Sequence, residues 1–411
     1  MIETSELETL INNLSCRDKS ERRMAAEKLG RSDGRAVPGL IRALEDESRG
    51  VQDAAMRSLI SIGGEAAVSG VIPLLRQGPY LRNTARLIIR EIGGPAAPLL
   101  RPLLSDKDDD VRTFCLDLIS DIGICGYTDD IIRLLRQDPN ANVRAAAARC
   151  LGRLCPTGAL PALIAALKDE EWVVFEAIAA LAEIKDESSV VHIGEALGHG
   201  SAAVRFAAAE ALGSMGYASA GPLLSARLLK AEGPERLAVI KSLIRLGISD
   251  SIPDAPLLLM DMLRKGDWEE KMIALKGVVD LRLEQAIPLM VDIAGSLDPS
   301  RPDAEEKLSA IQGAVSVFGC AAPLIDCLRN PSIKYRGRIF AIGMAAALDC
   351  RDALPAIIPL LGVKSVPVVL AAVDAIAKLC GCGAPAILSH LRRHEDKGVR
   401  ERVEAVLERV W

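Results

Sequence analysis

Cysteine and histidine are the residue types in this chain whose spacing could support metal or redox chemistry. Cys380 and Cys382 form the closest cysteine pair, and His390 and His394 are four residues apart, so the two histidines could share one face of a helix. A zinc-hydrolase helix also carries a glutamate between its two histidines, and a cysteine metal site needs a second cysteine pair. Neither accompanies these residues, so we predict no metal site and no cofactor.

The chain has ten cysteines, and five of them fall in turns that follow a recurring helical segment: Cys125, Cys155, Cys320, Cys350 and Cys382. Metal ligands must converge to about 2.3 Å from one point, whereas equivalent positions in stacked helices are about 9 Å apart. These cysteines are therefore expected to form no common site. The first residues show no export signal, so the sequence predicts free thiols in a reducing compartment and a cytoplasmic location.

Arginines form a stripe in the segment "YLRNTARLIIRE". Arg82, Arg86 and Arg90 are spaced i, i+4 and i+8, so they share one helical face that could dock an acidic or phosphorylated segment of a partner protein. The alternative is a solvated face that the aspartates at 108–110 in the next loop neutralise. Both interpretations stay open from the sequence.

Aromatic residues make up only 3% of the chain, and several stand at or just before the start of recurring helices. Tyr80, Trp172 and Trp268 are our candidate anchors for a partner, because tryptophan and tyrosine supply large contact areas at interfaces. Side chains that fill gaps between neighbouring helices would show the same placement.

These residues belong to a sequence pattern that recurs about every thirty residues, as in "VRTFCLDLISDIG" and "VRFAAAEALGSMG". A repeat of this period is one supersecondary unit that buries its apolar face only by stacking on its neighbours. We mark each unit by the residue that follows the apolar position of "VR": Arg22, Gln52, Arg82, Arg112, Arg144, Val174, Arg205, Arg236, Lys271, Leu308, Arg338, Leu370 and Arg400. The pattern predicts an all-α fold, a right-handed α-solenoid of about thirteen helical hairpins.

We predict one continuous solenoid over residues 1–411, with an irregular region at about 230–306 where the two longest steps between marks occur. Glycines such as Gly63 and Gly123 follow the marked helices and suit a left-handed helix end. Prolines such as Pro73 and Pro98 suit the first turn of the next helix, which should run for about ten residues.

Aspartates recur in the loops before the marked helices, at Asp18, Asp46, Asp106, Asp138, Asp169 and Asp396. An aspartate there can cap a helix and accept hydrogen bonds from the marked arginine of its own or a neighbouring unit. We therefore expect an arginine–aspartate ladder with a structural role along the stack.

Composition and charge disfavour several classes of function. The net charge is −5 and the candidate surface positions carry both signs, whereas a nucleic-acid groove is basic and supplies aromatic rings for stacking. We expect no membrane span, because prolines and charges interrupt the apolar runs. The sequence contains no glycine-rich phosphate loop, nucleophile elbow or acid–base pair, so we expect no enzymatic activity.

The repeat pattern is clearest in "VRAAAARCLGRLCPTGALPALIAAL" and "VRFAAAEALGSMGYASAGPLLSARL". It resembles the HEAT repeat of the type found in phycobilisome bilin lyases, and the resemblance covers essentially the whole chain. Most proteins of this type are scaffolds or adaptors; others are bilin lyases, DNA glycosylases and deoxyhypusine hydroxylase. The hydroxylase pattern needs several His-Glu pairs and only His394-Glu395 occurs, while the glycosylase pattern needs a basic cleft with aromatic residues.

The sequence therefore predicts a cytoplasmic, non-catalytic scaffold that binds another protein along the concave face of the solenoid. The alternative that the resemblance implies is a bilin-lyase-like factor for chromophore attachment, although no catalytic residues of that group can be carried over to this chain. A nucleic-acid-binding HEAT protein is the third and weakest alternative.

Overall fold

The computed structural model describes residues 4–409, and their regular secondary structure is entirely helical. Every marked residue lies in an even-numbered helix, and we call these helices the marked row. They are α2 (Lys19–Leu29), α4 (Arg49–Ile62), α6 (Pro79–Ile92), α8 (Asp109–Ile122), α10 (Ala141–Leu154), α12 (Glu171–Ile184), α14 (Ala202–Met215), α16 (Gly233–Arg245), α18 (Trp268–Asp280), α20 (Ala304–Phe318), α22 (Tyr335–Ala347), α24 (Val366–Cys380) and α26 (Lys397–Arg409).

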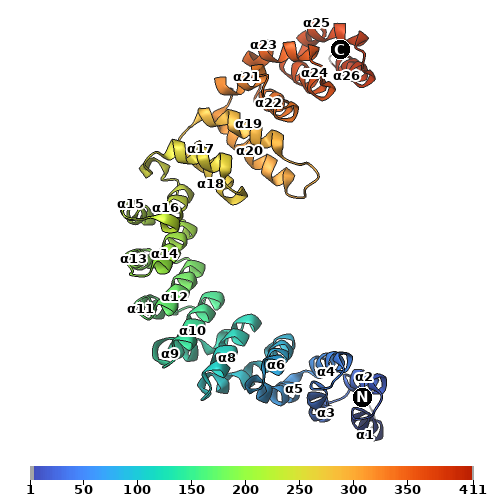
Figure 1. Ribbon diagram of the computed structural model, residues 1–411, viewed down its shortest axis with the longest axis vertical. Helices are drawn as coiled ribbons and strands as arrows, with labels where there is room; N and C mark the ends of the chain where they lie inside the picture. The colour runs from blue at the N-terminus through green and yellow to red at the C-terminus, as the bar shows by residue number, and fades with distance from the viewer. Residues whose placement is uncertain (1–3, 410–411) are drawn as a thin grey trace. The chain divides into compact units, whose positions relative to one another are not determined.

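The odd-numbered helices form a facing row that alternates with the marked row along the chain (Figure 1). They are α1 (Thr4–Asn13), α3 (Val37–Ala43), α5 (Gly64–Val71), α7 (Ala97–Leu100), α9 (Thr128–Gln137), α11 (Leu160–Ala166), α13 (Val190–Ala196), α15 (Gly221–Leu228), α17 (Ala255–Lys265), α19 (Ile287–Ser296), α21 (Ala322–Arg329), α23 (Leu354–Ile357) and α25 (Ala384–Leu388). Each facing helix and the marked helix after it make one hairpin, so the predicted all-α solenoid is confirmed.

Several facing helices are shorter than the predicted ten residues. The helix α5 gives way to a 3-10 segment at Ile72–Arg76, and α23 does the same at Ile358–Gly362. Pro73 and Pro359 stand at the start of these segments, where their rings clash with an α-helical continuation and their missing N–H removes a hydrogen bond. Pro73 was expected in the first turn of a helix; it breaks one instead. Pro98 lies in the first turn of α7 as predicted.

The chain divides into two compact units, residues 1–223 and 224–411. Within unit 1, successive marked helices pack side by side (Figure 1). The contact between α10 and α12 is especially extensive. The alanines at 145–148 are all buried, and a Cβ added to Gly152 would lie 2.6 Å from the Cα of Ala180. Small side chains at this contact let the two backbones approach closely.

The marked helices of unit 1 end as predicted where glycine follows. Gly63 after α4 has a φ of 59° and Gly123 after α8 a φ of 79°, a conformation that side chains with a Cβ rarely adopt. Cys155 and Lys185 take the same place after α10 and α12, with φ of 46° and 54°.

The arginine–aspartate ladder is present in unit 1. The guanidinium of Arg112 donates to Asp138 at 2.8 and 3.0 Å, and that of Arg144 donates to Asp169 at 2.8 and 2.7 Å. Each pair joins a marked helix to the loop before the next marked helix. Asp138 also accepts the backbone N–H of Asn140, two residues on, so the carboxylate orders its loop while it binds the neighbouring unit.

Each ladder arginine is also held by the loop of its own unit. The Nη1 atom of Arg144 donates to the carbonyl of Asp138 at 2.9 Å, and Nη1 of Arg112 donates to the carbonyl of Asp106 at 2.7 Å. The guanidinium therefore bridges the loops on both sides of its helix, and most of its side chain is buried. The predicted arginine–aspartate pairing is confirmed for Arg112 and Arg144. The carboxylate of Asp106, also expected in the ladder, pairs instead with Arg76, which is not a marked residue.

Two histidines stand where the ladder has no marked arginine. The marks Val174 and Leu370 cannot donate, and the loops that follow them carry His199 and His394 at the ladder position. The Nδ1 atom of each histidine accepts a backbone N–H two residues on, at 3.1 Å. Histidine thus accepts the same loop hydrogen bond that aspartate accepts in other repeats. It does so without a carboxylate, which the apolar side chains of Val174 and Leu370 could not pair.

Replacing Arg144 by alanine should lower the free energy of unfolding by about 2 kcal/mol, because the substitution removes charge-assisted hydrogen bonds from a mostly buried pair. Arg153→Ala on the same helix is the matched control. Its ion pair with Asp121 is largely exposed, and it should change stability by less than about 0.5 kcal/mol. Thermal and urea unfolding, followed by circular dichroism, measure the stability of the two variants.

The same pair should respond to pH. Hydrogen bonds from Arg144 hold the pKa of the Asp169 carboxyl below its ordinary value. A lowered carboxyl pKa stabilises the folded state above the unfolded pKa, and this contribution is lost as the pH falls through the folded value. The difference in free energy of unfolding between the wild type and Asp169→Asn should therefore shrink at acid pH. A difference that stays constant from pH 7 to pH 3 would show that the Arg144–Asp169 pair does not stabilise the fold.

Candidate functional site

The predicted arginine stripe lies on α6, and the structure gives each of its arginines an acidic neighbour. Arg86 is 3.1 Å from Asp117 on α8, and Arg82 is 3.8 Å from Asp110. Arg90 pairs with Glu91 beside it in the sequence. The stripe is thus part of an ion-pair surface, and its role in binding a partner stays a prediction.

Asp117 is one of the mixed-sign surface positions, and its role as the acidic partner of the stripe was not predicted. It accepts from Arg86 on one side and from Arg149 of α10 on the other, at 3.1 and 3.2 Å. Arg149 continues the chain of pairs to Glu176 of α12 at 2.9 Å. The expected neutralising aspartates were those at 108–110. The main neutralising carboxylate is instead in the middle of the next helix, because side chains at equivalent positions of stacked helices are neighbours.

Aromatic rings lie against the face of α6 that carries the arginine stripe. The guanidinium carbons of Arg82 and Arg86 lie 5.2 and 5.1 Å from the centroid of the Phe114 ring, within the range of cation–π attraction. Tyr80 is half exposed, and its hydroxyl donates to Gln52 at 2.8 Å. The stripe and Tyr80 therefore belong to one polar surface over α4, α6 and α8.

The aromatic residues of α12 and α14 form the most exposed apolar group on the marked row of unit 1. The side chain of Trp172 is 54% exposed, and its ring stacks on Phe175 with centroids 5.8 Å apart. Phe206 is 40% exposed and occupies the repeat position on α14 that Phe175 occupies on α12. We call Trp172, Phe175 and Phe206 the aromatic patch. The sequence singled out Trp172, but Phe206 was missed because a single phenylalanine within "VRFAAAEALG" carries no signal of exposure.

Trp268, the third aromatic candidate, is placed differently. It opens α18 in unit 2 and is only partly exposed, and the ammonium of Lys307 lies 5.0 Å from the centroid of its ring. Lys307 belongs to α20, so Trp268 fills the junction between two marked helices. Trp268 belongs to unit 2, whereas the other candidate residues belong to unit 1.

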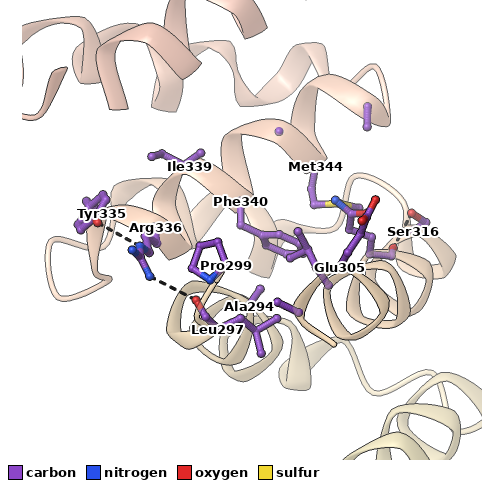
Figure 2. Close-up of a pocket in the computed structure, with 15 residues that line it drawn as sticks. Ala294, Leu297, Pro299, Glu305, Ser316, Tyr335, Arg336, Ile339, Phe340 and Met344 are labelled. Atoms are coloured by element: carbon purple, nitrogen blue, oxygen red, sulfur yellow. Dashed lines mark hydrogen bonds between the residues drawn. The ribbon is translucent and has the colours of Figure 1, made fainter. Parts of the chain in front are cut away.

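A large cleft opens in unit 2 between α20 and α22. Its volume is about 830 Å³, and most of its lining is apolar (Figure 2). Leu308 on one wall and Ile339 and Phe340 on the other are partly exposed to it. The loop at 297–303, which belongs to the most loop-like stretch of the sequence, contributes Pro299 to the edge of the cleft.

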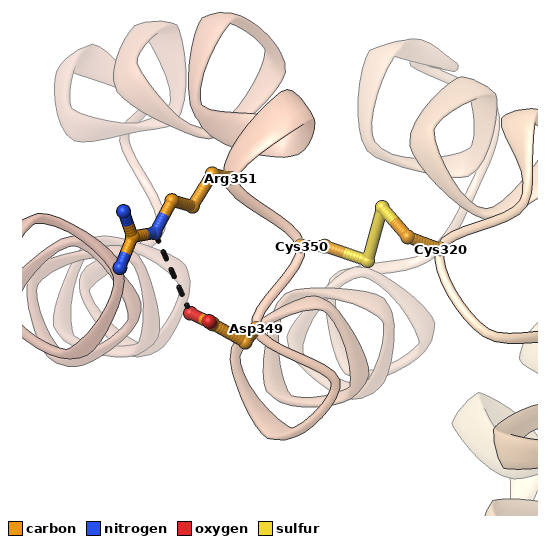
Figure 3. Close-up of a disulfide and its surroundings, with 4 residues drawn as sticks. All are labelled: Cys320, Asp349, Cys350 and Arg351. Carbon is orange, nitrogen blue, oxygen red and sulfur yellow. Dashed lines mark ion pairs between the residues drawn. A yellow bond between two sulfur atoms is a disulfide. The ribbon is translucent and has the colours of Figure 1, made fainter.

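A disulfide joins Cys320 and Cys350, whose Cα atoms are 5.4 Å apart (Figure 3). The expectation that all the cysteines are free is wrong for this pair. The stacking distance of about 9 Å separates helix axes, whereas the turns after neighbouring helices can converge more closely than the axes do. Since these turns follow α20 and α22, the disulfide ties together the ends of the two helices that flank the cleft.

The other cysteines and the histidines do not assemble a metal site. Across residues 4–409, no three His, Cys, Asp or Glu side chains are grouped so that they could hold a metal ion. Burial raises the pKa of the Cys327 thiol to about 11, which makes it a poor nucleophile at neutral pH. His390 lies in a 3-10 segment, Ser389–Arg393, and His394 follows it, so the α-helical face that the two were expected to share does not form.

One stretch of the described residues, Val366–Arg393, is long and apolar enough to cross a membrane by length and composition alone. Gly381, with a φ of 51°, separates α24 from the elements that follow. The helix α24 packs between α22 and α26 and buries Val369 and Val373. The core helix of a stacked repeat can pass the same test of length and composition.

A family model described as HEAT repeats matches residues 7–90, 128–192 and 175–244. HEAT repeats are therefore recognised within residues 7–244. The matched segments contain the arginine stripe and the aromatic patch. No curated protein matches this sequence.

Two of the solved structures that are similar to this chain in fold involve Kap95p and Kap121p. One shows that Kap95p binding induces the switch loops of RanGDP to adopt the GTP-bound conformation; the match has a TM-score of 0.56 and 13% identity and covers 99% of this chain and 66% of that chain. The other is Kap121p bound to Ste12p, with a TM-score of 0.51, 13% identity, and coverage of 100% of this chain and 53% of that chain. The chain therefore spans between half and two thirds of these longer chains, and at this identity the likeness shows the fold alone.

The ion-pair surface predicts different outcomes for two charge reversals on α6. Arg86→Glu places a carboxylate beside Asp117, so it should lower the free energy of unfolding by about 1–2 kcal/mol. Arg90→Glu changes a half-exposed side chain and should alter stability by less than about 0.5 kcal/mol. Thermal unfolding checks both; equal melting of the two variants would show that the Arg86–Asp117 pair contributes nothing.

Reduction of the disulfide should destabilise unit 2. The bond closes a loop of 30 residues, and the chain-entropy relation gives about 3–4 kcal/mol for that length. Cys320→Ser should melt earlier than the wild type under non-reducing conditions, whereas Cys382→Ser, at an exposed free thiol, should not. Thiol titration of the unreduced, denatured chain should find eight free thiols, and ten would contradict the disulfide.

Proposed function

We propose that the chain is a non-catalytic scaffold that binds another protein along the concave face formed by the marked row of unit 1. The observation that carries this proposal is the aromatic patch. Trp172 and Phe206 keep 54% and 40% of their side-chain surface exposed on adjacent, packed helices. Exposed tryptophan and phenylalanine side chains that lie close together are typical of surfaces that become buried in a complex.

The surroundings of the aromatic patch support a protein partner. Glu171, next to Trp172, accepts from the hydroxyl of Ser201, and Glu176 pairs with Arg149, so the carboxylates near the rings are already engaged. A partner that covers the rings therefore need not desolvate an unpaired charge at those carboxylates, which keeps the cost of association low.

The ion-pair surface favours a protein over a nucleic acid. A nucleic-acid groove needs arginines free to replace the counterions of phosphates. Arg86 and Arg149 share Asp117, and Arg112 and Arg144 are bound in the ladder. Arg90, whose neighbour is an exposed glutamate, is the stripe residue best placed to meet an acidic or phosphorylated segment of the partner.

The HEAT-repeat fold supports the same proposal at a coarser level. The two similar structures involve proteins named together with protein partners, Kap95p with RanGDP and Kap121p with Ste12p. The cytoplasmic location and the finer assignment to repeats of the phycobilisome lyase type stay predictions.

The purified chain, used as bait in native lysate at physiological salt with nuclease added, should retain a protein partner in stoichiometric amount. Trp172→Ala combined with Phe206→Ala should reduce its affinity at least about tenfold, because buried aromatic anchors dominate interface energies. Val191→Ala is the matched control, since Val191 is 55% exposed but lies on α13 of the facing row. Mass spectrometry identifies the partner, and titration with the purified partner gives the affinities.

A partner that binds the wild type and the double variant equally would exclude the aromatic patch. Retention that disappears with nuclease, or a bound chromophore in place of a protein, would overturn the scaffold proposal itself.

A further inference from the structure

The cleft between α20 and α22 is a second candidate binding site, on unit 2 and separate from the aromatic patch. We propose that it binds an amphipathic helix of a partner protein. This inference goes beyond the proposed scaffold function and does not depend on the aromatic patch, because no residue is shared between the two surfaces.

The cleft exists because α22 departs from the regular stacking. Successive marked helices elsewhere in unit 2 pack on one another. The helix α22 packs on α24 and about equally on the facing helix α19, but only lightly on α20. The contact with α19 is made by glycines. A Cβ on Gly295 would lie 2.5 Å from the backbone nitrogen of Gly337, so the two backbones meet directly. This close approach draws α22 toward α19 and leaves space beside α20.

The walls of the cleft have the dimensions of a helix-binding groove. One wall follows α20 from Ala304 to Ser316 and the other follows α22 from Tyr335 to Ala347. Twelve residues of helix rise about 18 Å, which is just over three turns. A partner helix of similar length would meet both walls, and such a helix places an apolar residue on one face at every third or fourth position.

The lining is apolar at its centre and open to solvent at its margin. Figure 2 shows Phe340 pointing from α22 into the space bordered by Ala294 and Pro299. Gln312 and Gly343 line the cleft and are exposed. A groove with an apolar centre and an exposed polar margin suits an amphipathic helix, whose polar face remains in water.

The charges on the two walls favour a helix with both signs beside its apolar stripe. Glu305 on α20 has no basic partner among the described residues. Arg336 on α22 donates to the Tyr335 hydroxyl at 3.0 Å and to the carbonyl of Leu297 at 3.3 Å. Within residues 4–409 it forms no ion pair within 4 Å, although the charge of Asp298 lies near it. A basic residue facing Glu305 and an acidic residue facing Arg336 would complement the groove. A fatty acid would satisfy Arg336 but would place its carboxylate in a cleft that already holds Glu305.

The test uses a displayed library of amphipathic helices of about 16 residues, with apolar positions varied among Leu, Ile, Met and Phe, selected on the full chain. Gly343→Trp fills the cleft from α22, where an added Cβ meets nothing within 4 Å. Gly313→Trp is the matched control, because Gly313 is an equally open, exposed glycine of α20 that does not line the cleft. Selected peptides should bind the wild type and Gly313→Trp equally and Gly343→Trp at least about tenfold more weakly.

A second variant tests the charges. Glu305→Lys should weaken peptides that carry a basic residue beside the apolar stripe, and an acidic residue at that peptide position should restore binding. Failure to select any helix, selected helices that bind Gly343→Trp as well as the wild type, or affinity for a fatty acid alone would overturn the proposal. None of these results bears on the aromatic patch, whose variants are tested separately with the captured partner.

Discussion

Repeats such as those marked by Arg112 and Arg144 depend on a contact that they cannot make alone, the bond between the marked arginine and the loop aspartate of the next repeat. The guanidinium of Arg144 is held by carbonyls of its own loop on one side and by the Asp169 carboxylate of the next loop on the other. This geometry fixes the distance between successive hairpins while the alanine faces pack. After the apolar marks Val174 and Leu370, histidine takes the place of the aspartate, and the loop hydrogen bond survives without the ion pair.

Regular stacking determines which side chains are left for a partner. Residues at the same position of successive units become neighbours, so Asp117 meets arginines of both adjacent marked helices. The charges of the marked row are largely satisfied within the row for that reason. Aromatic side chains also remain exposed on this row, and Trp172, whose ring stacks on Phe175, is an example. A surface of this kind discriminates partners by shape and aromatic contact more than by net charge.

In unit 2, the packing of α22 on α19 departs from the regular stacking of marked helices. Gly295 and Gly337 allow α19 and α22 to touch through their backbones, and this contact competes with the usual packing of α22 on α20. The resulting cleft has apolar walls that would normally be buried between two marked helices. The disulfide between Cys320 and Cys350 joins the turns that follow these walls and so limits how far they can separate.

Much of the fold could be predicted from the amino-acid sequence. The period of the repeat predicted the hairpins, glycines such as Gly123 predicted the helix ends, and the loop aspartates predicted the ladder, because each of these signals acts within one repeat or between a repeat and its neighbour. The lengths of the facing helices were predicted less well, since Pro73 and Pro359 act inside a helix and not at its start.

The candidate sites were decided by tertiary structure. Phe206 and Phe114 look alike in the sequence, yet one is exposed and the other lies under two guanidinium groups. The pairing of Cys320 with Cys350 and the cleft beside α20 depend on how closely two backbones approach, which glycine permits but does not specify. The sequence by itself therefore determined the repeat and its internal contacts, because these are local and periodic. Exposure and inter-helix spacing arise only when the repeats stack, because they depend on every side chain at the shared interface.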